Sequence, residues 1–235
     1  MNELNYERWA LTVNSRPHLD GGGKLLAPTF ERVIANSPTV FRSTEQPYYK
    51  NLLELGCGPA WVGMWLKEQG LCDNLHLSDI NPEVMICVMK SLTNKNMEAT
   101  TYISNMFNDM PSDVKFDCIV VNPPNYVDIQ KDHPHGYMAD DLRAADKGWA
   151  FHKSLYKSCG RYLAPDGEMF ISEVDVYSKV VMLAGEVYDR RERVPFEVFS
   201  EMAQENGLEI TQVGSMLGAR EISGASVEIL KVKHA

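Results

Sequence analysis

The sequence predicts an α/β fold in which seven short strands form a mostly parallel, doubly wound sheet with an antiparallel pair at one edge. Three observations predict it: short apolar or β-rich runs recur along the chain, segments of helical length fit between them, and glycine, proline and asparagine mark their boundaries. This alternation is typical of a parallel sheet, because parallel neighbours need a long crossover connection between them.

The first five predicted strands are short apolar or β-rich runs. In chain order they are 52–55, 75–77, 100–103, 118–121 and 168–172. Two more β-rich segments, 208–213 and 226–232, alternate apolar and polar residues about a loop that contains Gly218 and Gly224. We expect these two segments to form the antiparallel edge pair.

Four helices are expected, each with a start or stop signal of its own. They are 60–69 after a glycine-rich turn, 82–92 behind Asn81, 147–163 before the turn 164–167, and 195–206 closed by Gly207. Segment 177–193 is expected to be an additional helical, charged stretch. Its charged end, 189–193, is interpreted as solvated, with a clamp for a substrate carboxylate as the alternative.

A chain of 235 residues with 44% hydrophobic content is long enough to bury one full core. Glycine, proline and serine occur in short turn segments between the predicted elements and form no linker. We therefore expect a single domain over residues 1–235, with its core in 26–235. Residues 1–25, which include Tyr6, Trp9 and Arg16, are expected to fold over the site as a lid.

The net charge of −9 disfavours, without excluding, a nucleic-acid partner, because neutralising phosphates needs clustered lysine and arginine. The five cysteines form no Cys-x-x-Cys pair, which suggests neither a zinc cage nor a disulfide framework and fits a reducing compartment. The N-terminus lacks the apolar core of a signal peptide, and no apolar run approaches membrane-spanning length. We expect a cytoplasmic protein with no membrane partner; its oligomeric state stays open.

A glycine-rich turn joins the first strand to the first helix, in Leu52-Leu53-Glu54-Leu55-Gly56-Cys57-Gly58-Pro59-Ala60. Gly56 and Gly58 permit backbone conformations closed to other residues and let a ligand approach the main chain. A dinucleotide-binding turn needs a third glycine near position 61, but Trp61 stands there and Gly63 comes two residues late. The turn therefore indicates a nucleotide-type ligand without a pyrophosphate, or else a plain structural turn.

The second strand ends in an acid, Asp79, which can accept hydrogen bonds from two vicinal ribose hydroxyls, each worth about 1.5 to 3 kcal/mol. NAD and S-adenosylmethionine both carry such a ribose. The alternative is that Asp79 or Asn81 only caps the next helix. Glu54, at the end of the first strand, is placed where the positively charged methionine portion of S-adenosylmethionine would lie, although such an acid can instead fix the loop.

The strand 118–121 runs into Asn122-Pro123-Pro124-Asn125-Tyr126. This segment resembles the Asp-Pro-Pro-Tyr or Asn-Pro-Pro-Tyr motif of amino-methyltransferases, which methylate adenine N6, guanine N2 or glutamine N5. The resemblance implies a Rossmann-like S-adenosylmethionine-dependent methyltransferase that acts on a planar nitrogen. The side-chain carbonyl of Asn122 and the main-chain carbonyl of Pro123 could accept hydrogen bonds from the NH2 group, and the prolines hold these acceptors rigid. A plain strand-ending turn is the alternative.

Within this group the similarity is greatest to HemK/PrmC-like glutamine methyltransferases and covers residues from about 24 to 173. Segment 25–31 resembles the segment that precedes the first strand in that family, with Pro28 and Glu31 matching. Residues 128–135 occupy the place of the long substrate loop, and the spacing from 144–148 to 163–167 also matches. About 25 residues precede the resemblance, too few for the family's helical docking domain.

Two positions depart from the family pattern. Asn125 stands where the family has an aromatic residue that stacks on the target group, and Tyr126 could substitute for it. Asn105 stands where an Asp usually contacts the adenine amino group, and its amide oxygen could still accept that hydrogen bond. Phe107 beside it could pack on the adenine ring or belong to the core.

The residues at the predicted strand ends define a candidate site. The expected catalytic residues are Asn122, Pro123, Pro124 and Tyr126, and the expected cofactor-binding residues are Glu54, Gly56, Gly58, Asp79, Asn105 and Phe107. No metal is expected, because His133 and His135 lack a third ligand of matching spacing and are interpreted as loop residues.

The expected substrate bears an NH2 or amide nitrogen, on a small molecule or a protein glutamine. A small-molecule N-methyltransferase, acting on an amino acid or secondary metabolite, is the main alternative. A non-catalytic S-adenosylmethionine-binding scaffold is a second, which an intact Asn122-Pro123-Pro124 disfavours. An NAD-dependent oxidoreductase is disfavoured by the glycine spacing and by the absence of a Tyr-x-x-x-Lys pair.

Overall fold

The computed structural model describes residues 3–5, 12–14, 23–36, 49–132, 141–220 and 224–235. The chain divides into two compact units. The first comprises Met1–Asn122 with Tyr162–Met169, and the second comprises Pro123–Arg161 with Phe170–Ala235. The expectation of a single domain stays a prediction.

The expected α/β class is confirmed by a seven-stranded, mostly parallel sheet. Its strands hydrogen-bond in the order β10-β11-β7-β6-β3-β4-β5. Their bounds are β3 Tyr49–Leu55, β4 Cys72–Asp79, β5 Thr100–Ile103, β6 Phe116–Val121, β7 Leu163–Val174, β10 Leu208–Ser215 and β11 Val227–His234. All seven contain the predicted strands or overlap them closely, and β10 and β11 form the expected antiparallel pair.

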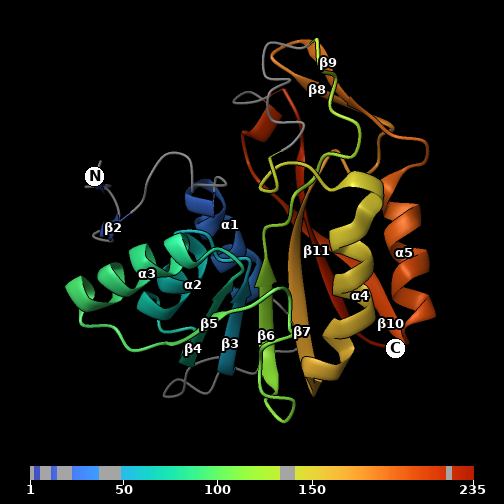
Figure 1. The fold of residues 1–235 in the computed structure, drawn as a ribbon. Helices are drawn as coiled ribbons and strands as arrows, with labels where there is room; N and C mark the ends of the chain where they lie inside the picture. Colours follow the sequence, from blue (N-terminus) through green and yellow to red (C-terminus); the bar gives the residue numbers. More distant parts are fainter. Residues whose placement is uncertain (1–2, 6–11, 15–22, 37–48, 133–140, 221–223) are drawn as a thin grey trace. The chain divides into compact units, whose positions relative to one another are not determined.

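The first unit contains the parallel strands β3 to β6 and three helices, α1 (Gly23–Ala35), α2 (Trp61–Glu68) and α3 (Pro82–Lys95), which Figure 1 shows lying together beside those strands. The start of α3 follows from its sequence: Asn81 accepts a hydrogen bond from the Glu83 N–H, and proline occupies the first helical position. Helix α1 contains the segment 25–31 and was not predicted, because Pro28 lies inside it.

The second unit contains all of α4 (Ala150–Tyr162) except its last residue, together with the preceding short 3-10 helix η3 (Lys147–Trp149) and α5 (Pro195–Glu205). The two α-helices lie side by side in Figure 1, and aromatic rings join them, because Phe199 of α5 stacks on His152 of α4 at 4.3 Å between ring centroids. Strand β7 already begins at Leu163, so the residues predicted as the turn 164–167 lie within its bounds.

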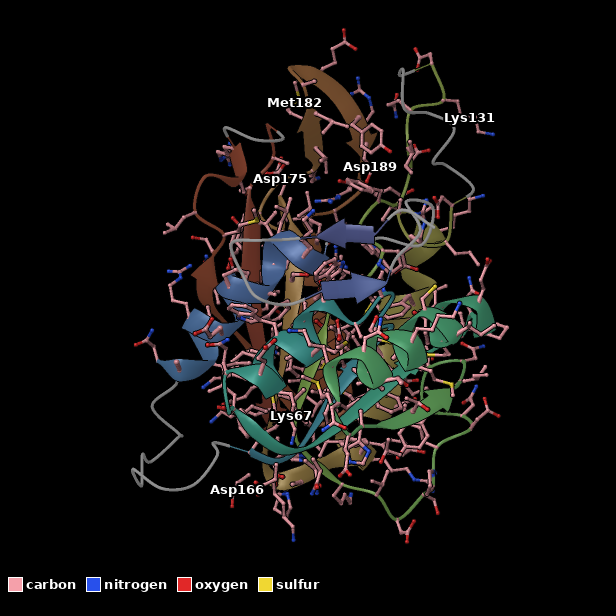
Figure 2. The ribbon with its side chains drawn as sticks, turned by 90° about the vertical axis from the view of Figure 1, so that its left-hand side faces the viewer. Lys67, Lys131, Asp166, Asp175, Met182 and Asp189 are labelled. Carbon is pink, nitrogen blue, oxygen red and sulfur yellow. The ribbon has the colours of Figure 1, made fainter. Side chains whose placement is uncertain are left out.

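The prediction of a helical stretch at 177–193 is wrong. The segment forms an antiparallel hairpin of β8 (Val180–Leu183) and β9 (Glu186–Arg190), on which Figure 2 labels Met182 and Asp189. Ala184 and Gly185, between the strands, both have positive φ, 53° and 87°, as a tight two-residue hairpin turn requires. Alanine is an uncommon residue in that position, so the turn is hard to recognise in the sequence.

The N-terminal segment forms a small hairpin of β1 (Glu3–Asn5) and β2 (Thr12–Asn14), and β2 lies against α3. Tyr6, Trp9 and Arg16, the residues singled out for a lid, lie outside the described residues. The lid therefore stays a prediction. In the part of the chain that the structure describes, no helix combines the length and apolar character needed to cross a membrane.

Helix α2 packs closely on the sheet at Gly63. A Cβ atom at this position would lie 2.8 Å from Glu54 Oε2 and 2.8 Å from Leu77 Cδ2. Both side chains are buried, at 5% and 0% exposure, and have little room to move. Gly63 therefore allows the helix and the strand to approach closely. The third glycine of a dinucleotide-binding turn has the same role, but it is expected near position 61, two residues before Gly63.

This packing predicts opposite effects for two helical glycines. Gly63→Ala is expected to lower the free energy of unfolding by about 1 to 3 kcal/mol, because the added methyl group overpacks the core. Gly160→Ala in α4 is the matched control, since its Cβ would meet Leu208 Cδ2 at 3.5 Å and His234 Cε1 at 3.7 Å, which are ordinary contacts. It is expected to raise stability by about 0.5 to 1 kcal/mol through helix propensity. Urea unfolding measures both, and equal effects would contradict the close approach at Gly63.

Candidate functional site

Three adjacent strands of the first unit end at one edge in register. Leu55 of β3 pairs with Ser78 of β4 and with Val121 of β6, in parallel. The next residues along the three strands are therefore Gly56, Asp79 and Asn122. Residues that follow neighbouring parallel strands in this way form the usual ligand-binding edge of an open α/β sheet. The glycine turn, the acid and the first residue of the Asn-Pro-Pro motif are thus brought together.

The glycine turn has left-handed backbone at Gly56, Gly58 and Ala60, with φ values of 66°, 49° and 65°. A Cβ atom at Gly56 would meet no other atom within 4 Å, so the main chain there borders open space. The Cys57 N–H donates to the Ser78 carbonyl at 2.8 Å and fastens the turn to the end of β4. The turn therefore offers the bare, fixed main chain that a nucleoside ligand could approach.

Asp79 binds the turn rather than capping a helix. Its Oδ2 accepts from the Gly58 N–H at 2.9 Å and its Oδ1 from the Asn81 N–H at 2.9 Å. Burial raises the pKa of Asp79, although these N–H groups oppose the change. The capping of α3 is done by the side chain of Asn81. Each carboxylate oxygen keeps further acceptor capacity, so the geometry fits a ribose diol.

Glu54 is 5% exposed, and its Oε2 accepts from the Gly63 N–H at 2.7 Å. Helix α2 has no side-chain cap at Ala60, so this carboxylate satisfies N–H groups at the positive end of the helix. Burial raises the pKa of Glu54 to about 8, against the opposing N–H groups of Gly63 and Val62. In the structure, Glu54 fixes the loop and helix, which is the alternative weighed from the sequence.

The other two expected cofactor residues lie differently. Asn105 is exposed after β5 and is free of packing by the core. Phe107 is 2% exposed and stacks on Tyr162 at 4.6 Å between ring centroids, while the Tyr162 hydroxyl donates to the Phe107 carbonyl at 3.1 Å. In the structure Phe107 is therefore a packing residue of the first unit.

Two exposed apolar side chains beside Asp79 went unnoticed in the sequence. Ile80, directly after the acid, is 57% exposed, and Ile103, which pairs with Asp79 in register, is 56% exposed. Large apolar residues at a ligand-binding edge offer a surface for a flat ring such as adenine. The signal that could have found Ile80 is its position immediately after the ribose-binding candidate.

Residues 123–130 of the second unit, here called the proline loop, are held from both sides. Asn125 is 6% exposed; its Nδ2 donates to the Pro123 carbonyl at 2.9 Å, and its Oδ1 accepts from the Val174 N–H at 2.9 Å. The ring of Tyr126 packs edge-on against Tyr188 at 4.9 Å, within a small apolar cluster. Asn125 thus orients the loop, and the partly buried Tyr126 packs against Tyr188 within the unit. A catalytic role of Tyr126 stays a prediction.

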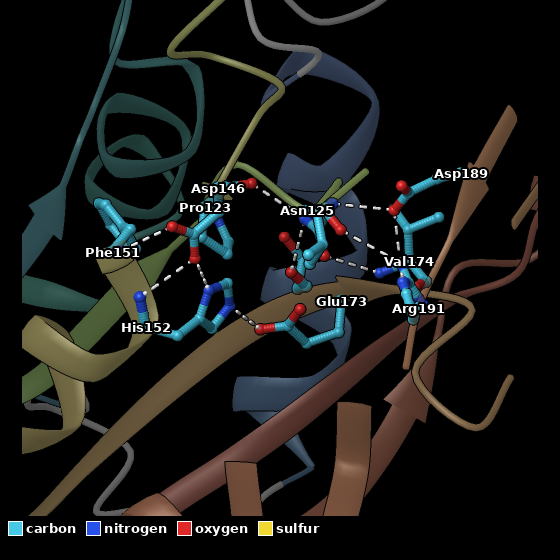
Figure 3. A network of polar contacts seen from close by, with 11 residues as sticks. Pro123, Asn125, Asp146, Phe151, His152, Glu173, Val174, Asp189 and Arg191 are labelled. Atoms are coloured by element: carbon cyan, nitrogen blue, oxygen red, sulfur yellow. Dashed lines mark hydrogen bonds and ion pairs between the residues drawn. The ribbon is translucent and has the colours of Figure 1, made fainter. Parts of the chain in front are cut away.

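A buried triad at the start of α4 was not found from the sequence. His152, with no exposed surface, contacts Asp146 Oδ2 through Nδ1 at 2.5 Å and Glu173 Oε1 through Nε2 at 2.9 Å (Figure 3). Burial favours the neutral ring, but the two carboxylates prevail and raise the pKa of His152 to about 9. Asp146 also caps α4 by accepting from the Phe151 N–H at 2.7 Å.

Other residues of the expected family pattern are placed as follows. Glu31 accepts from the indole N–H of Trp65 at 2.7 Å and so joins α1 to α2. His133 and His135 lie outside the described residues. Among the residues that the structure does describe, no group of three histidine, cysteine or carboxylate side chains has a metal-binding arrangement.

The parallel strands, with a glycine turn and an acid at neighbouring strand ends, define a Rossmann-like fold of the nucleoside-binding kind. The chain belongs to the methyltransferase small domain family, whose model matches residues 10–136, more than half of it. The expectations of a methyltransferase and of S-adenosylmethionine as its cofactor are thereby confirmed.

Curated relatives carry the name ribosomal RNA small subunit methyltransferase C. The one from Haemophilus ducreyi is 29% identical over 131 residues, which are 53% of this chain and 36% of the relative. The one from Pasteurella multocida is 31% identical over 80 residues, 34% of this chain and 24% of the relative. The chain thus spans about a quarter to a third of the length of the curated relatives that it matches.

Solved structures share the fold. The Thermus thermophilus 16S rRNA N2 G1207 methyltransferase RsmC, in complex with AdoMet and guanosine, has a TM-score of 0.53 at 14% identity, over 90% of this chain and 42% of that one. An S-adenosylmethionine-dependent methyltransferase from Clostridium acetobutylicum has a TM-score of 0.54 at 12% identity, over 92% of both chains. At these identities the likeness shows the fold alone.

The position of Asp79 predicts a direct effect on cofactor binding. Asp79→Asn is expected to weaken S-adenosylmethionine binding roughly ten- to hundred-fold, because it removes a charged acceptor and turns an amide donor toward one of two N–H groups. Asp73→Asn, on an exposed part of the same strand, is the matched control and should bind normally. Isothermal titration measures both. Unchanged affinity in Asp79→Asn would show that this carboxylate only orders the turn.

Proposed function

We propose that this domain transfers the methyl group of S-adenosylmethionine to an exocyclic amino nitrogen, and that a guanine NH2 group is the first acceptor to test. One observation carries the proposal: Leu55 is in register with both Ser78 and Val121. Because of this register, the residues that directly follow the three strands lie at the same edge of the sheet. They are Gly56 of the glycine turn, Asp79, which is proposed to bind the ribose, and Asn122, which is proposed to bind the amine.

The residues present fit the cofactor. The open main chain at Gly56, the carboxylate of Asp79 and the exposed side chain of Ile80 suit a nucleoside with a ribose diol and a flat base. When bound, S-adenosylmethionine supplies an electrophilic methyl group on a positively charged sulfur. We assign its binding to these residues together with Gly58 and Asn105, while Glu54 acts on the cofactor indirectly by fixing the turn and helix α2.

The chemistry asks the protein mainly for orientation. The amine nitrogen would form the new N–C bond with its lone pair, the methyl group would leave sulfur as a neutral thioether is formed, and the amine would lose one proton to solvent water. The side-chain oxygen of Asn122 and the carbonyl of Pro123 accept hydrogen bonds from the NH2 group and direct its lone pair. Orientation of this kind can contribute on the order of 7 to 11 kcal/mol.

The guanine acceptor is supported by the names of the relatives, which are ribosomal RNA methyltransferases. These names weigh against the expectation, drawn from the net charge of −9, that nucleic acid is disfavoured.

A second acceptor class, a glutamine amide or small-molecule amine as in the HemK/PrmC-like interpretation, is favoured by one observation. Asn125 replaces the aromatic residue of the motif and is bonded within the protein, so this position offers no ring for stacking on a base.

The test is transfer of a labelled methyl group from S-adenosylmethionine to three probes: guanosine, a short guanine-containing RNA hairpin and a glutamine-containing peptide. Mass spectrometry of the products locates the new methyl group. We expect methylation at guanine N2 in the RNA or the nucleoside. Methylation of the peptide alone would favour the second acceptor class, and cofactor binding without transfer to any probe would favour a non-catalytic scaffold.

A further inference from the structure

We propose that Asp189, near the end of strand β9, and Arg191, just beyond it, are positioning residues that hold the proline loop in its working conformation. Arg191 acts through Asn125, and Asp189 acts through Val127 and Asp128. The inference rests on the proposed function, because it assigns the loop to the acceptor amine. It concerns contacts inside the second unit only (Figure 3).

Arg191 is buried, with its side chain 2% exposed, and its guanidinium binds main-chain carbonyls. Nη2 donates to the carbonyls of Asn125 at 3.1 Å and Val174 at 2.9 Å, and Nη1 donates to that of Asp175 at 2.9 Å and that of Ser178 at 3.3 Å. One side chain thus joins the proline loop to the end of β7 and the residues after it.

Asp189, with no exposed surface, binds the same loop as a hydrogen-bond acceptor, whereas Arg191 binds it as a donor. Its Oδ2 accepts from the Val127 N–H at 2.9 Å and its Oδ1 from the Asp128 N–H at 2.5 Å. The Gln130 N–H donates to the Tyr188 carbonyl at 2.8 Å, which extends the contact with β9 along the loop. Arg191 therefore holds loop carbonyls while Asp189 holds loop N–H groups.

Asn125 carries this constraint to the acceptor carbonyl. Its main-chain oxygen is bound by Arg191, and its side chain donates to the Pro123 carbonyl at 2.9 Å and, more weakly, to the Ser172 carbonyl at 3.4 Å. The direction of the Pro123 carbonyl is therefore set by a residue that β9 immobilises. A carbonyl oxygen has two lone pairs, so the bond from Asn125 leaves capacity for an amine N–H.

The charged run 189–193 agrees with the solvated interpretation at Arg190, Glu192 and Arg193, which are exposed. Arg191 fits neither that interpretation nor the substrate clamp, because it is buried. A substrate clamp needs exposed donors, and a solvated end needs an exposed side chain. Both guanidinium NH2 groups are instead bound to main-chain oxygens inside the unit, and Asp189 lies 3.6 Å from Nε. Lysine cannot reproduce this arrangement, because its donors radiate from one nitrogen atom.

The experiment compares Arg191→Lys and Asn125→Asp with the matched control Arg193→Lys. Arg193 is two residues away and pairs with Glu201 on the surface. Asn125→Asp keeps the acceptor for the Val174 N–H but removes both side-chain donors. With guanosine as the acceptor probe, we expect kcat to fall roughly ten- to hundred-fold in both test variants. The dissociation constant for S-adenosylmethionine should stay close to that of the wild type in both test variants, and Arg193→Lys should match the wild type throughout. The Tm of Asn125→Asp is expected to fall, because its second carboxylate oxygen faces the Pro123 carbonyl in a buried place.

Hydrogen exchange separates this inference from the proposed function. We expect the amides of 125–130 to exchange faster in Arg191→Lys than in the wild type or Arg193→Lys, whether or not guanosine is methylated. Unchanged exchange in the loop, or a wild-type kcat in both test variants, would overturn the positioning role. If Arg191→Lys fails to fold, Asn125→Asp decides: a kcat loss with intact cofactor binding supports the role, and parallel loss of kcat and cofactor binding overturns it. A wild-type protein that methylates no probe contradicts the proposed function alone.

Discussion

Replacing Asn122 by alanine is expected to lower turnover by a factor of about 10² to 10³ while leaving S-adenosylmethionine affinity within a few-fold of the wild type. The reason is that its side-chain oxygen is proposed to act on the amine, whereas the cofactor is assigned to residues of the neighbouring strands. Asn122 directly follows β6, whose register with β3 sets its place beside Gly56. Single-turnover kinetics and isothermal titration measure the two quantities separately.

Asn122→Asp is the matched control, because the related motif carries either an asparagine or an aspartate at this position. It retains an acceptor oxygen of the same reach and should keep a substantial part of the activity. If Asn122→Ala loses cofactor affinity and turnover together, Asn122 is a structural residue and the assignment of the amine to it is wrong.

Replacing His152 by glutamine is expected to lower the free energy of unfolding by about 3 to 5 kcal/mol, the usual cost of breaking a buried ion network from one side. The imidazolium lies between Asp146 and Glu173, which are 3% and 1% exposed. It joins α4 to β7 and stacks on Phe199 of α5. Without it, two buried carboxylates face each other without the cation that compensates them.

The same network predicts a pH dependence with a definite sign. The pKa of His152 is about 9 in the folded protein, above the ordinary value of 6.5. Its stabilising contribution is therefore fully present below pH 6.5 and is lost as the pH rises through 9. The loss amounts to roughly 3 kcal/mol for a shift of this size. The stability difference between wild type and His152→Gln should narrow over this pH range.

Urea unfolding at a series of pH values measures both effects of His152→Gln. His234→Gln, near the end of β11 and only partly buried, serves as the control and should stay close to the wild type. A loss below about 1 kcal/mol, or a difference that is constant from neutral pH to pH 9, would show that His152 is not held as an imidazolium.

The sequence predicted the parts of this fold that depend on residues close to one another in the chain. Strand alternation, helix boundaries at Asn81 and Pro195, and the antiparallel final pair all agree with the structure. The main error in a described segment, 177–193, has a local cause as well: Ala184-Gly185 forms a tight turn without the usual asparagine or aspartate.

The candidate site could be predicted only in part. Gly56, Asp79 and Asn122 each follow a recognisable strand, and the register of parallel strands brings them to one edge. The role of Glu54 as a helix cap depends on Gly63, whose task is visible only when the helix lies on the sheet. Phe107 shows the limit of position alone, because its packing partner Tyr162 is 55 residues away.

The order of strands and helices, the open glycine turn and the acid that follows it are properties of short stretches of chain, governed by side-chain periodicity and backbone sterics. Only the tertiary structure decided which hydrogen-bond partners the buried polar groups have. Asp189 reaches Val127 across 62 positions and Arg191 reaches Asn125 across 66. A charged side chain in a linear chain is as compatible with solvent as with burial, and only the packed protein supplies the carbonyls and N–H groups that compensate its lost hydration.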